Sequence, residues 1–378
     1  MMESELSSPP ADVRSRFAPV YDVLNGAIAA HAFPGCAFGV FAHGNVVLED
    51  ALGRFTYDDE AKAVTPTTIY DLASLTKVVA TTAATMLLHQ KGLLELDTPL
   101  GDLLPGFVVG RTSTERARHV KLRHLLAHNS GLPGYAELFR TAASTAALIA
   151  ACQQLPLEAE PGRRAEYSDP GFILLGKALE ILTGEDLAAL VRSAILKPLD
   201  LSATGFTPPL DSQPFIPPTE EDISFRHRRI QGEVQDENAW VMQGVAGHAG
   251  LFSNVADLLR FASQILAALH PTERSDGPTL FAPETVRTFA ERQGPEGSTR
   301  TLGWDTPSPE SSAGRYFSAK SIGHLGYSGC SLWIDLEAGV AIVLLTNRTW
   351  PDRKNLAIRG VRPAFHDAVR EALLPANR

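Results

Sequence analysis

The stretch SLWIDLEAGVAIVLLTN, residues 331–347, decides the fold class. Its two apolar runs, SLWID and GVAIVLLTN, are separated by a short break at residues 336–338, which is typical of two neighbouring strands. The N-terminal part of the chain mirrors this pattern. There, CAFGVFA and VVLEDALGRF are joined by His-Gly-Asn at residues 43–45, a combination that favours a tight hairpin turn. We therefore predict strands at both ends of the chain.

Between these two strand pairs, apolar residues recur with a helical period. Helices are expected around residues 122–128, 141–153, 170–182 and 185–195, and a closing helix is expected at 353–374. Strands and helices do not alternate regularly, which argues against a parallel sheet. The pattern predicts an α/β fold of the α+β kind: one antiparallel sheet built from both termini, flanked by helices, with an inserted all-helical region.

This arrangement divides the chain into three parts. Residues 1–16 are expected to form a polar N-terminal tail, and residues 101–239 a mainly helical region. Residues 17–100 and 240–378 are expected to form one discontinuous α/β region. We expect the functional site in the cleft between the two folded regions.

The composition of the 378-residue chain is that of an ordinary globular protein, with 44% hydrophobic residues and a net charge of −9. This charge offers no broad attraction for nucleic acid or for an anionic membrane, and no apolar segment is long enough to span a bilayer. The first residues lack the basic start and apolar run of a secretion signal. Cys36, Cys152 and Cys330 are odd in number and far apart, so no disulfide framework is expected. A cytoplasmic location is the simplest expectation.

The first candidate for chemistry is DLASLTKVVATTAATMLLHQKG, residues 71–92. Its apolar residues follow a helical period, which places Ser74 at the start of the helix and Lys77 almost one turn later on the same face. A serine hydroxyl at a helix start could act as a nucleophile, because the helix dipole favours developing negative charge there. A free lysine is mostly charged at neutral pH, however, so the pair needs a further partner before it can transfer protons.

Two more segments supply possible partners. In GRRAEYSDPGFILLGKALEILTG, residues 162–184, Asp169 is expected as the helix N-cap before Pro170, which places Tyr167 on the preceding loop. A phenol there can relay a proton if a nearby cation lowers its pKa. In SIGHLGYSG, residues 321–329, His324 is expected on an edge strand next to glycines that allow close approach of a ligand.

Taken together, the motifs Ser74–Lys77, Tyr167–Asp169 and His324–Gly326 resemble those of the serine β-lactamase and penicillin-binding-protein superfamily. The similarity is greatest to its class C-like branch, which includes the family VIII carboxylesterases. Flanking stretches such as LRHLLAHNSGLPGY and GVAGHAGLFSNVADLLRF are also similar, and the resemblance runs from about Val20 to the C-terminus. It implies a β-lactamase/transpeptidase-like fold.

The resemblance also implies the roles of several residues. Ser74 would attack an acyl carbon, while Lys77 and Tyr167 would share the base and acid roles. The backbone N–H groups of Ser74 and Tyr327 would form the oxyanion hole. An acyl-enzyme would then be hydrolysed by water.

The resemblance further implies substrate contacts by Asp169, His324 and Gly326. Two of these residues depart from the usual pattern. Where the superfamily usually has Asn, Asp169 can only accept hydrogen bonds, and its charge would tend to keep Lys77 protonated. Where β-lactamases usually carry the Lys that pairs with the antibiotic carboxylate, His324 is the form associated with esterases.

The leading hypothesis is therefore a serine hydrolase that forms an acyl-enzyme on Ser74 and hydrolyses small esters without a cofactor. A β-lactamase or D-amino-acid peptidase on the same site remains open, as does a penicillin-binding protein that is acylated without turnover. The expected partner is a small ester or amide. His124 and His128 have the spacing of metal ligands, but they lack a third ligand and the glutamate of H-E-x-x-H, so no metal is expected.

Overall fold

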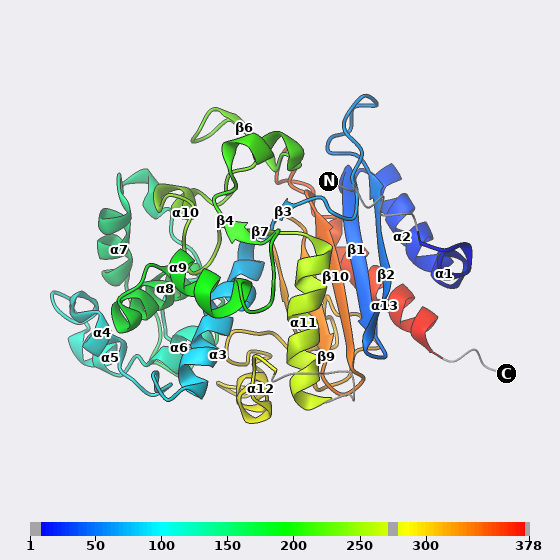
Figure 1. The fold of residues 1–378 in the computed structure, drawn as a ribbon. Coiled ribbons are helices and arrows are strands. Elements are labelled where there is room, and N and C mark those ends of the chain that lie inside the picture. Colours follow the sequence, from blue (N-terminus) through cyan, green and yellow to red (C-terminus); the bar gives the residue numbers. More distant parts are fainter. Residues whose placement is uncertain (1–8, 271–278, 375–378) are drawn as a thin grey trace.

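A five-stranded antiparallel sheet forms the centre of one half of the computed structural model, which describes residues 9–270 and 279–374 (Figure 1). The N-terminal and C-terminal strands meet through β1 and β10, in a register that pairs Cys36 with Thr346 and Phe41 with Ala341. The strand order is β2-β1-β10-β9-β8. The strands run as follows: β1 Gly35–Ala42, β2 Asn45–Gly53, β8 Ser321–Leu325, β9 Ser331–Asp335 and β10 Val340–Thr346. The predicted α/β (α+β) fold class, with a sheet built from both termini, is confirmed.

Helices cover both faces of this sheet, which explains why residues 340–345 of β10 are all apolar. Helices α2 (Ala18–Ala29) and α13 (Ile358–Leu373) pack together on one face, and α11 (Val255–Leu269) packs on the other (Figure 1). Along β10, Ile342 and Leu344 join the core under α2 and α13, while Val343 and Leu345 join the core on the opposite face. Successive side chains therefore alternate between two buried surfaces.

Most of the remaining helices form the other half of the molecule, with α8 at their centre (Figure 1). Helix α8 carries Phe172, Leu175 and Leu179 in the main core, as the apolar spacing predicts. The bounds of these helices are α3 Ala83–Gln90, α4 Leu100–Leu103, α5 Thr114–Arg118, α6 Leu122–Leu126, α7 Thr145–Gln153, α8 Asp169–Thr183, α9 Leu187–Val191, α10 Glu237–Val241 and α12 Pro283–Ala290.

Two details differ from the expected division of the chain. The segment expected to be mainly helical also contains short strands: β4 (Gly205–Phe206) joins β3 (Tyr70–Asp71) and β7 (Leu251–Ser253), while β5 (Glu220–Asp222) pairs with β6 (Arg228–Ile230). The expected N-terminal tail contains helix α1 (Ala11–Arg16), and residues 1–8 of it lie outside the described residues. The domain boundaries themselves stay a prediction.

Within residues 9–270 and 279–374, no helix is both long enough and apolar enough to cross a membrane.

Candidate active site

Ser74 lies in a short 3-10 turn, Ala73–Leu75, between strand β3 and the helical segment that leads into α3. The residue before it, Ala73, has a φ of 46°, a left-handed conformation that is costly for a side chain other than glycine. Asp71 supports this turn, because its Oδ1 accepts a hydrogen bond from the Ala73 N–H at 2.8 Å. Its Oδ2 accepts from the Gln235 N–H at 2.7 Å, which ties the turn to a distant loop. The strained turn thus places the Ser74 hydroxyl on a rigid support.

Lys77 is fully buried directly behind Ser74. Its Nζ donates to Ser74 Oγ at 3.0 Å, to Asp169 Oδ1 at 2.6 Å and to the His248 carbonyl oxygen at 3.2 Å. Burial alone would lower the pKa of Lys77, but the Asp169 carboxylate and Tyr167 outweigh it and raise this pKa. Lys77 is therefore a cation at neutral pH, held between the Ser74 hydroxyl and a carboxylate.

Asp169 is the first residue of helix α8, and the expectation that it caps this helix is wrong. Ser168 is the N-cap: its Oγ accepts from the Gly171 N–H at 3.1 Å and donates to the Pro133 carbonyl oxygen at 2.7 Å. The Asp169 carboxylate is therefore free to pair with Lys77, at a position where the helix dipole also favours a negative charge.

Tyr167 lies on the loop before α8, as expected, and its ring faces two cations. The Lys77 Nζ lies 4.8 Å from the ring centre, and the Arg300 guanidinium carbon lies 5.2 Å from it. Burial raises the pKa of the Tyr167 phenol, although Lys77 and a hydrogen bond with Ser74 act in the opposite direction. Tyr167 is a neutral phenol in the resting protein, next to the predicted nucleophile.

Two buried imidazoles flank the ring of Tyr167. The ring centres of His128 and His324 lie 4.6 Å and 5.8 Å from that of Tyr167. Burial, together with Arg300 and Lys77, holds the pKa of both imidazoles well below the usual value, so both are neutral. Neither imidazole adds charge to the site at neutral pH.

The hydrogen bonds of these imidazoles fix opposite tautomers. The Nδ1 of His128 accepts from the Ser168 N–H at 2.9 Å, which leaves the proton on its Nε2. The Nδ1 of His324 lies 2.9 Å from the Leu325 carbonyl oxygen and must donate to it, which leaves its Nε2 without a proton. Among the described residues, neither Nε2 atom has a hydrogen-bond partner.

The predicted oxyanion hole lies where the turn after β8 approaches the Ser74 turn. Tyr327 and Ser74 line the same cavity, and no described residue accepts a hydrogen bond from the Tyr327 N–H. Gly326 allows this approach, because a Cβ atom there would lie 2.5 Å from the Leu72 carbonyl oxygen. The two N–H groups thus remain candidates for binding a developing oxyanion.

A cavity of about 420 Å³ opens above these residues. His324 and Gly326, both expected to contact substrate, are not part of its lining, because His324 lies beneath Tyr167 and Gly326 packs against Leu72. The lining consists of Ala73, Ser74, Tyr135, Glu137, Phe139, Arg140, Tyr167, Asp169, Ser224, Gln235, Asp236, Glu237, Ala249, Tyr327 and Arg353.

The two arginines of this lining are already paired. Arg140 Nε lies 2.6 Å from Glu137 Oε2. Arg353 Nε donates to Glu220 Oε1 at 2.8 Å, and its Nη2 lies 3.0 Å from Glu237 Oε1. The cavity therefore presents no unpaired cation among the residues that the structure describes.

Residues 20–362 match the family model described as Beta-lactamase. The chain belongs to the beta-lactamase family. A relative named putative D-alanyl-D-alanine carboxypeptidase, from Escherichia coli (strain K12), is 32% identical over 328 residues, which is 78% of this chain and 72% of the relative. A relative of the same name from Salmonella typhimurium is 30% identical over 348 residues, which is 84% of this chain and 79% of the relative.

Solved structures of the same fold include EstCE1, described as a hydrolase with promiscuous acyltransferase activity. Its TM-score is 0.75 at 20% identity, and the match covers 96% of this chain and all of EstCE1. A penicillin-binding protein homologue from Caulobacter crescentus has a TM-score of 0.74 at 19% identity, covering 97% of this chain and 99% of the homologue. The resemblance to the serine β-lactamase and penicillin-binding-protein superfamily is thus confirmed, and the protein is a serine hydrolase.

Several residues of the site have no clear signal in the sequence. In the sequence, His128 stood out only because its spacing from His124 is that of two metal ligands. In the structure, the His124 Nδ1 instead accepts a hydrogen bond from the Lys121 N–H at 3.1 Å. No group of three or more metal-ligating side chains occurs in the described ranges. No sequence pattern predicts that Arg300 lies beside Tyr167 or that Asp236 lines the cavity, because both positions depend on how distant loops meet.

Proposed function

We propose that this serine hydrolase is a carboxylesterase that forms an acyl-enzyme on Ser74 and hydrolyses small neutral esters. The observation that supports this proposal most is the charge state of the cavity. Its arginines are paired with glutamates, and His324, which stands where β-lactamases have a lysine, is neutral and lies outside the lining. A substrate carboxylate would lose its hydration in this cavity without gaining a free cation, whereas a neutral ester has no such cost.

The proposed reaction begins with attack of Ser74 Oγ on the ester carbonyl carbon. The carbonyl oxygen becomes an oxyanion between the N–H groups of Ser74 and Tyr327, and the Ser74 proton moves to the Lys77–Tyr167 pair. Collapse of the intermediate breaks the bond to the alcohol oxygen, which takes this proton and leaves. Water then attacks the acyl-enzyme by the same steps, which releases the acid and restores the Ser74 hydroxyl.

The raised pKa values of Lys77 and Tyr167 restrict when this can happen. The pair has to lose one proton before it can take the proton of Ser74, and that loss belongs to the coupled pair rather than to one residue. We therefore expect activity to rise toward alkaline pH.

The test is hydrolysis of 4-nitrophenyl acetate by the wild type and by Ser74→Ala. The variant should lose acyl-enzyme formation and turnover. Ser263→Ala, the same change on the α11 helix away from the cavity, should keep both. Full activity in Ser74→Ala would contradict the proposal.

A second candidate, D-alanyl-D-alanine carboxypeptidase, is favoured by the name of the curated relatives. A comparison of a D-Ala-D-Ala peptide, a chromogenic cephalosporin and the acetate ester separates these functions. The ester should give the highest kcat/KM, because the other two substrates carry a carboxylate. A fluorescent penicillin that stays bound to Ser74 without turnover would instead indicate a penicillin-binding protein.

A further inference from the structure

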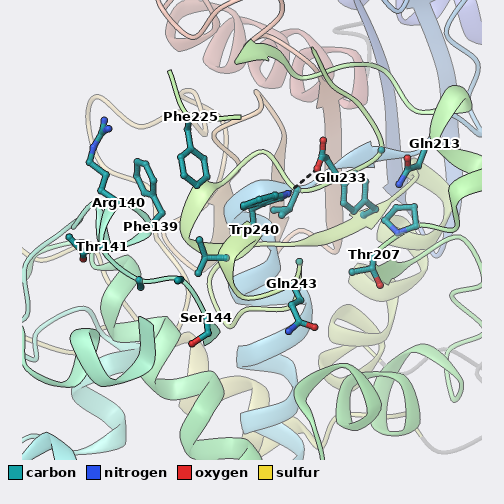
Figure 2. A pocket seen from close by; sticks show the side chains of 18 residues that line it. Phe139, Arg140, Thr141, Ser144, Thr207, Gln213, Phe225, Glu233, Trp240 and Gln243 are labelled. Atoms are coloured by element: carbon teal, nitrogen blue, oxygen red, sulfur yellow. Dashed lines mark hydrogen bonds between the residues drawn. The ribbon is translucent and has the colours of Figure 1, made fainter. Parts of the chain in front are cut away.

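A second cavity has a volume of about 800 Å³ (Figure 2). It lies beside the cavity of about 420 Å³ that Ser74 lines, which we call the catalytic cavity. One wall is the loop at residues 139–144, and the other walls come from residues 207–213, 225, 232–234 and 240–252. The volume falls within the range of sites that bind small organic molecules. None of the residues assigned to catalysis lines it, so the kind of ligand that it can bind depends on its own lining residues.

The walls of the two cavities are continuous, because three segments of the chain contribute to both. Residues 139–140 line both cavities. Ser224 lines the catalytic cavity while its neighbour Phe225 lines the second. Along residues 233–241, Gln235 and Glu237 face the catalytic cavity, whereas Trp240 faces the second. The two cavities therefore adjoin and share part of one wall.

A row of aromatic rings begins at this shared wall. The ring centres of Phe139 and Phe225 lie 4.7 Å apart, and those of Phe225 and Trp240 lie 5.5 Å apart, both with edge-to-face geometry. Figure 2 shows the three labelled side chains in this order along the cavity. Trp240 is 38% exposed, and its Nε1 donates to Glu233 Oε2 at 3.1 Å, so its polar edge is satisfied while ring surface remains open. Such a surface binds aromatic and apolar groups.

The charged side chains that line this cavity already have partners of opposite charge, so they do not favour a charged ligand. Arg140 and Glu233 are the charged residues of its lining. Arg140 pairs with Glu137, and Glu233 pairs with Arg228 through Nη2 at 2.7 Å. Each charge is thus paired with a side chain of opposite charge, Arg140 with Glu137 at the surface and Glu233 with Arg228.

From the shared walls, the aromatic row and the paired charges, we infer that the second cavity is a subsite for the neutral aromatic end of an extended ester held at Ser74. This inference rests on the proposed esterase function and names the class of substrate that this site prefers. The aromatic end belongs to the acid or to the alcohol portion of the ester, and the test distinguishes the two.

The test compares esters with and without the aromatic end in two variants. Ethyl 6-phenylhexanoate and 6-phenylhexyl acetate carry the ring on the acid and alcohol side, and hexyl acetate carries none; pH-stat titration follows the hydrolysis of all three. Trp240→Ala should lower kcat/KM for at least one phenyl ester by roughly fivefold to tenfold, the loss expected when an apolar contact with a large ring disappears. Ala143→Trp, which adds a large side chain to the lining of the cavity, should act in the same direction.

Hexyl acetate and a matched variant provide the controls. Ile223→Ala removes an apolar side chain that is 84% exposed and lines neither cavity, and it should leave all three esters unchanged. If Trp240→Ala lowers kcat/KM equally for all three esters, Trp240 has a structural role and the subsite is refuted. The subsite is refuted as well if neither cavity variant lowers kcat/KM selectively for a phenyl ester.

Binding of neutral 6-phenylhexanol, followed by calorimetry, separates failure of the subsite from failure of the esterase proposal. The alcohol should bind the wild type and bind more weakly to Trp240→Ala, whether or not the protein hydrolyses esters. Equal binding by the two proteins would refute the subsite. Absence of hexyl acetate hydrolysis would refute only the esterase function.

Discussion

Replacement of Asp169 by Asn tests how the ion pair behind Ser74 controls the reaction. The amide has nearly the same size and can still accept a hydrogen bond from Lys77, but it has no charge. Lys77 is fully buried and Asp169 is 16% exposed, so water screens this pair only in part. At the observed distance of 2.6 Å between Nζ and Oδ1, and with an effective dielectric of about 20, the attraction is roughly 6 kcal/mol.

This attraction sets an upper limit of about four pH units for the effect of the substitution, since one unit corresponds to about 1.4 kcal/mol. The amide dipole keeps part of the interaction, so we expect about two units. The direction follows from the charge: without the carboxylate, the pKa of Lys77 falls, and the Lys77–Tyr167 pair loses its proton at lower pH. The acid limb of the kcat/KM profile should therefore move to lower pH in Asp169→Asn.

The assay is hydrolysis of an alkyl acetate, followed by pH-stat titration across the pH range in which both proteins stay folded. Asp186→Asn is the matched control, because Asp186 caps helix α9 by accepting from the Ala189 N–H and lies outside the cavity. It should leave the acid limb in place. Coincident acid limbs for the wild type and Asp169→Asn would refute the electrostatic coupling between Asp169 and Lys77.

Three further predictions concern the support of the site. Arg300→Met removes one cation from the face of Tyr167, so it should move the acid limb up by roughly half to one pH unit and lower kcat, and a change in KM alone would contradict this. Gly303→Ala should lower the free energy of unfolding by about 2–3 kcal/mol in urea titrations, because φ is 93° and the new Cβ would lie 2.1 Å from Thr82 Oγ1; an unchanged midpoint would count against it. Burial raises the pKa of Asp71 to about 6, so its stabilising contribution is complete at acid pH and is lost as the pH rises through 6. Asp71→Asn should accordingly gain about 2–3 kcal/mol relative to the wild type between about pH 4 and about pH 8, and a constant difference in urea unfolding would argue against this linkage.

The sheet could be predicted from the sequence because its strands carry unusually clear signals. The residues of β10 are all buried, since helices cover both faces, and this produces the continuous apolar run at residues 340–346. The spacing of Ser74 and Lys77 was equally informative, because three residues nearly complete a helical turn and bring the two side chains to one face. Both signals are local, so the sequence contains them in full.

The helix cap at Ser168 could not be predicted, because Ser and Asp are almost equally good N-caps. A contact distant in sequence decides which residue caps the helix. The Lys77 ammonium pairs with the Asp169 carboxylate, and the adjacent Ser168 hydroxyl accepts the capping hydrogen bond instead. The position of Arg300 beside Tyr167 has the same origin. The backbones of Arg300 and Asp305 pair with each other, and Asp305 pairs in turn with Gly323 within β8. Such contacts form only when distant loops come together in the folded protein, so no local sequence pattern predicts them.

The opposite tautomers of His128 and His324 determine how the acid limb is to be interpreted. Each imidazole has one ring nitrogen committed to the backbone, and the other is buried without a partner among the described residues. Protonation would place a buried charge between Lys77 and Arg300, which is why the pKa of both imidazoles lies well below its usual value. The acid limb of the activity profile, expected at alkaline pH, therefore does not arise from the two imidazoles beside Tyr167. It reports the proton shared by Lys77 and Tyr167, the proton whose release the Asp169 carboxylate opposes.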